Sequence, residues 1–170
     1  MSARQSRAAA LAVAWLVGGT SWAAALLAAP YIVTHRAPHQ PAYAAASGVY
    51  LLGHLVCHQR ASRSFHLWGV QLPVCARCTG LYAATPLGAG WALALAQGRA
   101  GRRRRTNRGR LVALAAVPTV VTLALEGLGG AWVSNLIRAI AALPLGGAAA
   151  WAVSTALVED AATRAGWRLR

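Results

Sequence analysis

Three cysteines carry the clearest chemical potential in the chain, and all of them lie within residues 57–78. Cys75 and Cys78 form a C-x-x-C pair, whose two-residue gap lets both sulfurs face one point. Cys57 and His58 supply two further candidate ligands from the other end of the same stretch. Four-coordinate zinc sites are built from such split pairs. The sequence therefore predicts a site for zinc or another transition metal, formed by Cys57, His58, Cys75 and Cys78.

The same cysteines have two other interpretations. A C-x-x-C pair is also typical of a disulfide or a thiol redox couple, and a cysteine is otherwise an ordinary small buried residue. The odd number of cysteines slightly favours metal binding, because a disulfide between two of them would leave the third thiol unpaired. Pro73 fits the first turn of a helix, so Cys75 and Cys78 would lie where the helix dipole favours a thiolate. That position suits metal binding and redox chemistry equally.

Arginines flank the cysteine stretch, at positions 60, 63 and 77. Guanidinium groups bind oxyanions such as phosphate or carboxylate through paired N–H donors. We therefore interpret Arg60, Arg63 and Arg77 as candidate anion-binding residues. Alternatively, the three arginines form a solvent-exposed rim and bind no anion.

Glu126 is one of only three acidic residues, and it falls within an apolar segment. An ionisable side chain in a membrane is costly unless it is paired or faces a polar cavity. Arg138 is its natural partner, and Asn135 lies three residues earlier on the same helical face. The three residues form a structural tie between two helices, a catalytic group, or a site that binds a solute or a proton. In the catalytic case Glu126 is the general acid or base, while Arg138 and Asn135 stabilise an anion.

The composition limits the elements that can position these side chains. The chain is 57% hydrophobic and 12% charged, whereas a soluble domain is about a quarter charged. It has a formal net charge of +14, and every basic residue is an arginine. Such a chain is too apolar to stay disordered. A soluble enzyme is therefore nearly excluded, and a polytopic helical membrane protein is the class that fits.

Apolar runs locate the predicted membrane segments, since a bilayer core needs about 20 apolar residues per helix. The runs are residues 8–33, 42–56, 79–97, 111–129 and 133–158. The segment 42–56 is short, so it is a tilted span or a re-entrant arm, and we favour a span. We predict an all-α transmembrane helix bundle of about five spans, or four if 42–56 is re-entrant, forming one integral membrane domain over residues 1–170. Small residues would permit close helix packing at Gly88, Gly90, Gly146 and Gly147.

An arginine-rich loop at residues 98–110 sets the predicted orientation. Arginines in short loops favour the cytoplasmic side, so this loop and the C-terminus are expected inside and residues 57–78 outside the plasma or inner membrane. A nucleic-acid or anionic-lipid patch is the alternative for these arginines. Because the loop lies between two spans, we expect the lipid bilayer and no nucleic acid as partner. Chain alternation then brings the cysteines, Glu126 and Asn135 to the same membrane face, in one site.

A denser pattern surrounds the candidate ligands. Its residues are Cys57, His58, Gln59, Arg63, Ser64, Phe65, Gly69, Gln71, Pro73, Cys75, Arg77, Cys78, Thr79, Gly80 and Tyr82, followed downstream by Glu126, Gly127, Asn135 and Arg138. This pattern resembles the signature of domain of unknown function family 2085, a family of prokaryotic membrane proteins, which usually has aspartate at the position of Glu126. The resemblance covers roughly residues 45–150. It implies a small multi-span membrane protein and carries no established activity.

Three classes of function are open from the sequence. The first is a metal-dependent membrane enzyme acting on an amphiphilic substrate, in which His58 stays free because a catalytic metal needs an open position. The second is a binding or transport component with a structural metal site, where so small a chain would work as a homo-oligomer. The third is a thiol redox protein, in which Cys75 and Cys78 exchange electrons and Cys57 acts as the resolving thiol. The sequence identifies no substrate.

Overall fold

The computed structural model describes residues 3–97, 107–129 and 133–166. The helices are α1 (Ala3–His35), α2 (Pro41–Val56), α3 (Ala76–Gln97), α4 (Arg108–Gly127) and α5 (Asn135–Gly166). Between α2 and α3 lie a short 3-10 turn, η1 (Ala61–Arg63), and two short strands, β1 (His66–Leu67) and β2 (Val70–Gln71). Each predicted apolar segment is therefore helical, and the predicted helix bundle is confirmed. Most of the predicted arginine-rich loop, residues 98–106, lies outside the described residues.

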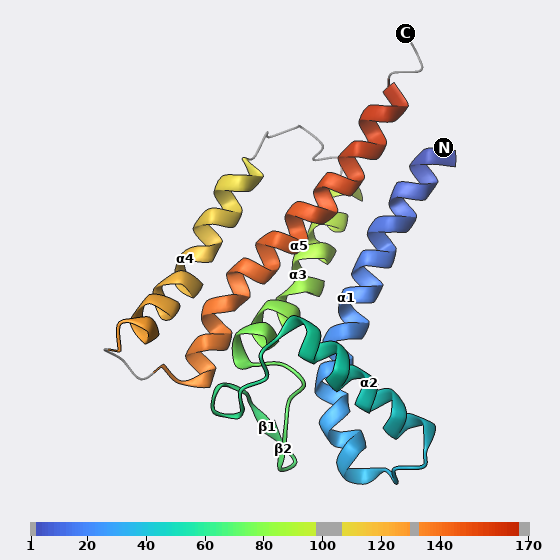
Figure 1. The fold of residues 1–170 in the computed structure, drawn as a ribbon. Coiled ribbons are helices and arrows are strands. Elements are labelled where there is room, and N and C mark those ends of the chain that lie inside the picture. The colour runs from blue at the N-terminus through green and yellow to red at the C-terminus, as the bar shows by residue number, and fades with distance from the viewer. Residues whose placement is uncertain (1–2, 98–106, 130–132, 167–170) are drawn as a thin grey trace.

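The four long helices run side by side, with α5 between α4 and the pair formed by α1 and α3 (Figure 1). Helix α3 packs most extensively against α5 and also contacts α1, whereas α4 packs mainly against α5. The start of α1, the end of α3, the start of α4 and the end of α5 lie at one end of the bundle (Figure 1). The segment between α2 and α3 lies at the opposite end, together with the end of α4 and the start of α5. We call this opposite end the loop end.

Three of the described helices are long and apolar enough to cross a bilayer. They contain the candidate spans Ala10–His35, Arg108–Gly127 and Asn135–Val158. Large apolar side chains on the bundle surface, such as Leu87, Val120 and Ile140, are more than half exposed. Such a surface is costly in water and suits contact with lipid tails.

Helix α2 differs from the other four helices in length and position. Its 16 residues make it about 24 Å long, which is less than the roughly 30 Å core of a bilayer. It lies along the half of α1 nearest the loop end and does not run the length of the bundle (Figure 1). Its apolar surface remains largely open, with Leu51 70% and Leu55 79% exposed.

Glycines allow α3 and α5 to approach closely. A Cβ atom at Gly80 would overlap the carbonyl of Ala139, and one at Gly88 would overlap the carbonyl of Gly147. Gly146 of α5 meets the backbone of α3 in the same way. Close approach increases van der Waals contact, which stabilises helix pairs in lipid where no hydrophobic driving force acts. The predicted close packing is therefore present at Gly88, Gly146 and Gly147, while Gly90 faces open space.

Each long helix also contains an internal proline: Pro30, Pro86, Pro118 and Pro144. A proline disturbs the hydrogen bonds of the preceding turn, and in a membrane the freed carbonyls need other donors. In α5, Pro144 frees the carbonyl of Ile140, and the carbonyl of the next residue, Ala141, accepts a 2.9 Å hydrogen bond from the Thr119 hydroxyl of α4. This bond ties α4 to α5 near the loop end.

Candidate functional site

Hydrogen bonds from glutamine side chains close the segment between α2 and α3. Gln59 has a left-handed φ of 46°, and its amide donates to the carbonyls of Tyr50 at 2.9 Å and Pro73 at 2.6 Å. The amide of Gln71 donates to the Gln59 carbonyl at 2.6 Å and to the Ser64 hydroxyl at 3.2 Å. The two ends of the segment are therefore held together, so residues far apart in sequence become neighbours.

Strands β1 and β2 form a hairpin within this segment, and only two residues connect them. Both connecting residues have positive φ, 52° at Trp68 and 78° at Gly69, as a type I′ turn requires. The Trp68 ring packs edge-on against Tyr31 of α1, with ring centroids 5.3 Å apart. The hairpin is thereby fixed to the end of α1.

The three cysteines meet where this segment joins α3. The Sγ atoms of Cys57, Cys75 and Cys78 all lie within 4.8 Å of one another, and all three residues are free thiols. The backbone N–H of Cys75 donates to the Cys57 sulfur at 3.1 Å. Sulfurs that share one tetrahedral zinc ion lie about 3.8 Å apart, so this spacing fits a common metal ion. The cluster packs against Leu26 of α1 and Val74.

His58 does not join this cluster. Helix α2 ends at Val56, and Cys57 has extended backbone angles of φ −150° and ψ 141°. Neighbouring side chains of an extended chain point to opposite sides, so a buried Cys57 turns His58 outward. Its imidazole is exposed, and Nδ1 accepts a 3.2 Å hydrogen bond from the Arg60 backbone N–H. The structure thus brings together three of the four predicted ligands.

The cysteines also change one another's acidity. A hydrogen bond from the Cys78 side chain lowers the pKa of Cys75 to about 5. The same contact raises the pKa of Cys78 above its ordinary value. The lowered pKa favours the thiolate of Cys75, which is the form that ligates metals and reacts with disulfides.

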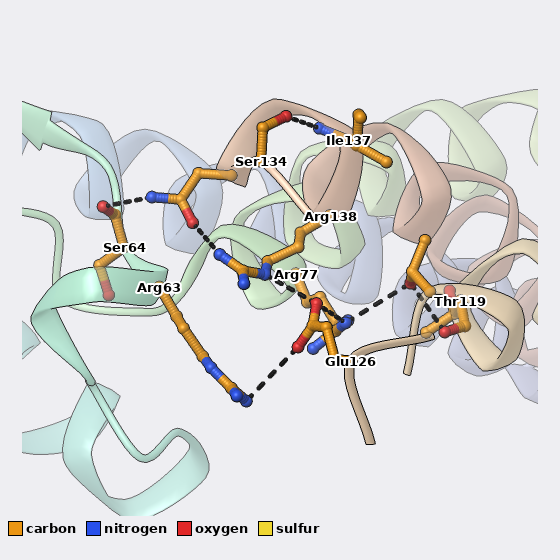
Figure 2. A network of polar contacts seen from close by, with 10 residues as sticks. Arg63, Ser64, Arg77, Thr119, Glu126, Ser134, Ile137 and Arg138 are labelled. Carbon is orange, nitrogen blue, oxygen red and sulfur yellow. Dashed lines mark hydrogen bonds and ion pairs between the residues drawn. The ribbon is translucent and has the colours of Figure 1, made fainter. Parts of the chain in front are cut away.

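A second polar cluster surrounds Glu126 in the last turn of α4 (Figure 2). One carboxylate oxygen accepts a 2.6 Å hydrogen bond from Arg77 Nη2 and a 2.9 Å bond from Arg138 Nε. The other oxygen forms an ion pair with Arg63 Nη1 at 3.5 Å. The contact expected between Glu126 and Arg138 is therefore present, within a larger group that we call the Glu126 network.

Amide and hydroxyl groups hold the network in place. Asn135 accepts a 2.6 Å hydrogen bond from Arg138 Nη1 and donates to the Ser64 carbonyl at 3.0 Å. Thr122 accepts a 3.5 Å bond from Arg77 Nη2. The Ser134 hydroxyl accepts from the Ile137 N–H at the start of α5, as an N-cap residue does (Figure 2). The network thus joins α3, α4 and α5 to the segment after α2.

Charges in the network do not balance. Three guanidinium groups face one carboxylate, so two positive charges are in excess. The Glu126, Arg138 and Arg77 side chains are 8%, 10% and 12% exposed, while Arg63 is 35% exposed at the rim. Within the described part of the chain, Arg77 Nε and Glu126 Oε2 are buried without a hydrogen-bond partner. Unbalanced buried charge is costly, so an anion or water molecule that paired with these groups would stabilise the network.

The predicted anion-binding arginines divide between two environments. Arg63 and Arg77 belong to the Glu126 network, whereas Arg60 is exposed and stands outside it. Along α3, Arg77 points roughly 130° away from the mean direction of Cys75 and Cys78. The cysteines therefore face α1 and α2 while Arg77 faces α4 and α5. The expected single site consists of two clusters at the loop end, on different faces of α3.

Several residues of the site are absent from the sequence prediction. Gln59, Ser64 and Gln71 position the segment, and their only signal was membership of the motif around the cysteines. Thr119 and Thr122 support the network from α4, and a pair of threonines in an apolar helix is too common a feature to identify them.

The long apolar helices with exposed apolar surfaces define the class as a helical integral membrane protein. Residues 57–152 match the family described as "Predicted membrane protein (DUF2085)", which is more than half of the chain, so the chain belongs to this family. Over 40 residues it is 42% identical to an uncharacterized protein of Methanocaldococcus jannaschii. That match covers 24% of this chain and 26% of that protein, so the chain spans about a quarter of the relative's length. No solved structure matches the chain.

Proposed function

We propose that this membrane protein binds zinc or another thiophilic transition metal through Cys57, Cys75 and Cys78. The observation that carries the proposal is the convergence of three thiols from two distant parts of the chain, with all Sγ atoms within 4.8 Å. Free cysteines that served only as apolar filler would have no reason to meet. Residues that close the segment between α2 and α3 would position the ligands.

The fourth coordination position belongs, in this proposal, to a water molecule or an external ligand. His58 is exposed and hydrogen-bonded to the backbone of Arg60, so we do not include it among the ligands. A metal with three protein ligands and one open position is typical of catalytic sites, where it acts as a Lewis acid. The proposed site would therefore serve metal-dependent chemistry on an amphiphilic substrate at the loop end.

For orientation, we propose that the loop end faces the outside of the cell and that α2 does not cross the bilayer. The arginines around residues 98–110 and both termini would then be cytoplasmic, in agreement with the positive-inside rule. The metal site would lie at the outer face of the plasma or inner membrane.

Elemental analysis of protein purified in detergent without chelator tests the metal site. We expect about one metal ion per chain in the wild type and none in the Cys75→Ser, Cys78→Ser double variant. The His58→Ala variant should retain the metal, and the His66→Ala variant, which changes another exposed histidine, serves as its control.

Metal-free wild-type protein that stays folded would overturn the proposal. A dithiol that then cycles reversibly to a disulfide would establish the thiol redox function in its place, because three thiols in contact contain an exchanging pair and a resolving thiol. Loss of metal in His58→Ala, but not in His66→Ala, would make His58 the fourth ligand and the site closed.

A further inference from the structure

The Glu126 network has an excess of positive charge that the metal site does not explain. The network faces α4 and α5, whereas the cysteines face α1 and α2. Glu126 neutralises one guanidinium group of three, and two positive charges remain. A network whose only task was to tie helices together would be more stable if its charges balanced.

We propose that Arg63, Arg77 and Arg138 form a binding site for a phosphate group, with Glu126 holding the guanidinium groups in register. Each guanidinium carries five N–H donors, and Glu126, Asn135 and Thr122 use only a minority of those in the network. The remaining charge of +2 matches a phosphate monoester or hydrogen phosphate, which carries between one and two negative charges at neutral pH. A carboxylate would neutralise only half of the excess positive charge.

Arg63 provides the entrance to this site. Its side chain is 35% exposed, and its 3.5 Å contact with Glu126 is longer than the contacts made by Arg77 and Arg138. It comes from η1 and not from a membrane helix, so it can engage an anion at the surface while the two buried arginines remain in place (Figure 2). The buried Arg77 Nε, which has no partner among the described residues, is a donor that a small rearrangement would make available.

The depth of the network agrees with a phosphate at the bilayer surface. Glu126 lies one residue before the end of the candidate span Arg108–Gly127, and Asn135 begins the span Asn135–Val158. The network is therefore level with the ends of two apolar segments, where lipid headgroups lie. The phosphate can belong to a lipid that ends in a phosphate monoester, such as phosphatidic acid, or be free in solution, since both present the same oxygens.

Thermal unfolding in a maltoside detergent tests the site, with inorganic phosphate compared with chloride at matched ionic strength. Native mass spectrometry provides a second arm, with phosphatidic acid compared with diacylglycerol of the same chains. We expect saturable stabilisation by phosphate or binding of phosphatidic acid in the wild type. Arg63→Ala should weaken the effect about tenfold because one charge is lost, whereas Arg60→Ala, which changes an exposed arginine outside the network, should not.

Glu126→Gln distinguishes a phosphate site from a purely structural network. Glutamine keeps an oxygen that accepts from the guanidinium groups while the local charge rises to +3, so phosphate affinity should rise on the order of tenfold in protein that folds. A purely structural network predicts no gain in affinity. If this variant does not fold, the comparison of Arg63→Ala with Arg60→Ala still tests whether the network binds phosphate.

Each outcome has a defined meaning. Arg63-dependent binding of phosphatidic acid alone identifies a lipid headgroup as the source, and an Arg63-dependent effect of inorganic phosphate identifies a soluble phosphate compound. Equal responses of the wild type, Arg63→Ala and Arg60→Ala would reduce the effect to general ionic screening and overturn the proposal. Absence of any response to either probe would also overturn it. The metal content of Arg63→Ala should stay at the wild-type level, so the proposed phosphate site and the proposed metal site are tested independently.

Discussion

Glu126 has contacts with three arginines from three different parts of the chain. Arg77 comes from α3, Arg138 from α5 and Arg63 from η1. A carboxylate that is only 8% exposed in an apolar helix is tolerable because these partners surround it. The same carboxylate separates three cations that would otherwise repel one another.

Removal of this carboxylate should therefore destabilise the protein in phosphate-free detergent. We expect Glu126→Gln to lower the free energy of unfolding by about 3 kcal/mol, since breaking a buried pair leaves charges without compensation. Adding Arg138→Gln should restore part of the loss, because it removes one of the uncompensated cations. Unfolding followed by circular dichroism measures both effects. An unchanged midpoint in Glu126→Gln, relative to Arg60→Gln as control, would show that the network contributes nothing to stability.

At the residue level, the sequence predicts which side chains pair better than it predicts which way a side chain points. The pair of Glu126 and Arg138 follows from the cost of an unpaired acid in lipid, and the structure contains it. His58 shows the opposite case. Its neighbour Cys57 is in the cluster, but the extended backbone that turns His58 outward depends on where α2 ends. The role of Arg77 could not be predicted either, because it depends on which face of α3 meets α4 and α5.

At the level of elements, the contact between α3 and α5 determines the shape of the site. Gly80 and Gly88 let the two backbones approach, so the start of α3 lies against the start of α5. This approach brings Arg77 and Arg138 to the same carboxylate. Disturbing the helix contact should therefore disturb the Glu126 network as well.

Substitutions at two glycines on α3 provide a matched test of this packing. Gly88→Ala should destabilise the protein by about 2 kcal/mol or more, because its Cβ would overlap the carbonyl of Gly147. Gly90→Ala should leave stability unchanged or raise it slightly, because the space around Gly90 is open and alanine favours the helix. Thermal unfolding of both variants in one detergent measures the difference. Equal stability of the two would mean that α3 and α5 do not approach as closely as this structure has them.

Helix positions follow from the sequence because long apolar runs have few alternatives in a membrane protein. The residues of α4 and α5, for example, are predicted as segments 111–129 and 133–158 and observed as Arg108–Gly127 and Asn135–Gly166. The segment between α2 and α3 could not be predicted in the same way. Its shape depends on hydrogen bonds from Gln59 and Gln71 to carbonyls up to 14 residues away, and no periodic pattern encodes such contacts.

At the level of the whole molecule, the position of α2 decides how the chain crosses the membrane. We expect α3, whose 22 residues pack against α1 and α5, to cross the membrane together with the three candidate spans. With α2 as a fifth span, the two termini would lie on opposite sides. With α2 as an arm beside α1, four helices would cross and both termini would share one side. In Figure 1 the start of α1 and the end of α5 lie at the end opposite the segment between α2 and α3, so we propose the second arrangement.

Epitope tags distinguish the two arrangements in intact cells. We expect tags at the N-terminus and at the C-terminus to be inaccessible to antibody until the cells are permeabilised. A tag inserted next to the exposed Trp68 and Gly69 at the hairpin turn should be accessible from outside, because that turn lies at the loop end. Accessible tags at the N-terminus and at the hairpin, together with a protected C-terminal tag, would establish five spans, with α2 crossing as a short tilted helix. Accessible tags at both termini would invert the orientation, and the two polar clusters would then face the cytoplasm, where metal supply and soluble phosphate differ from those outside.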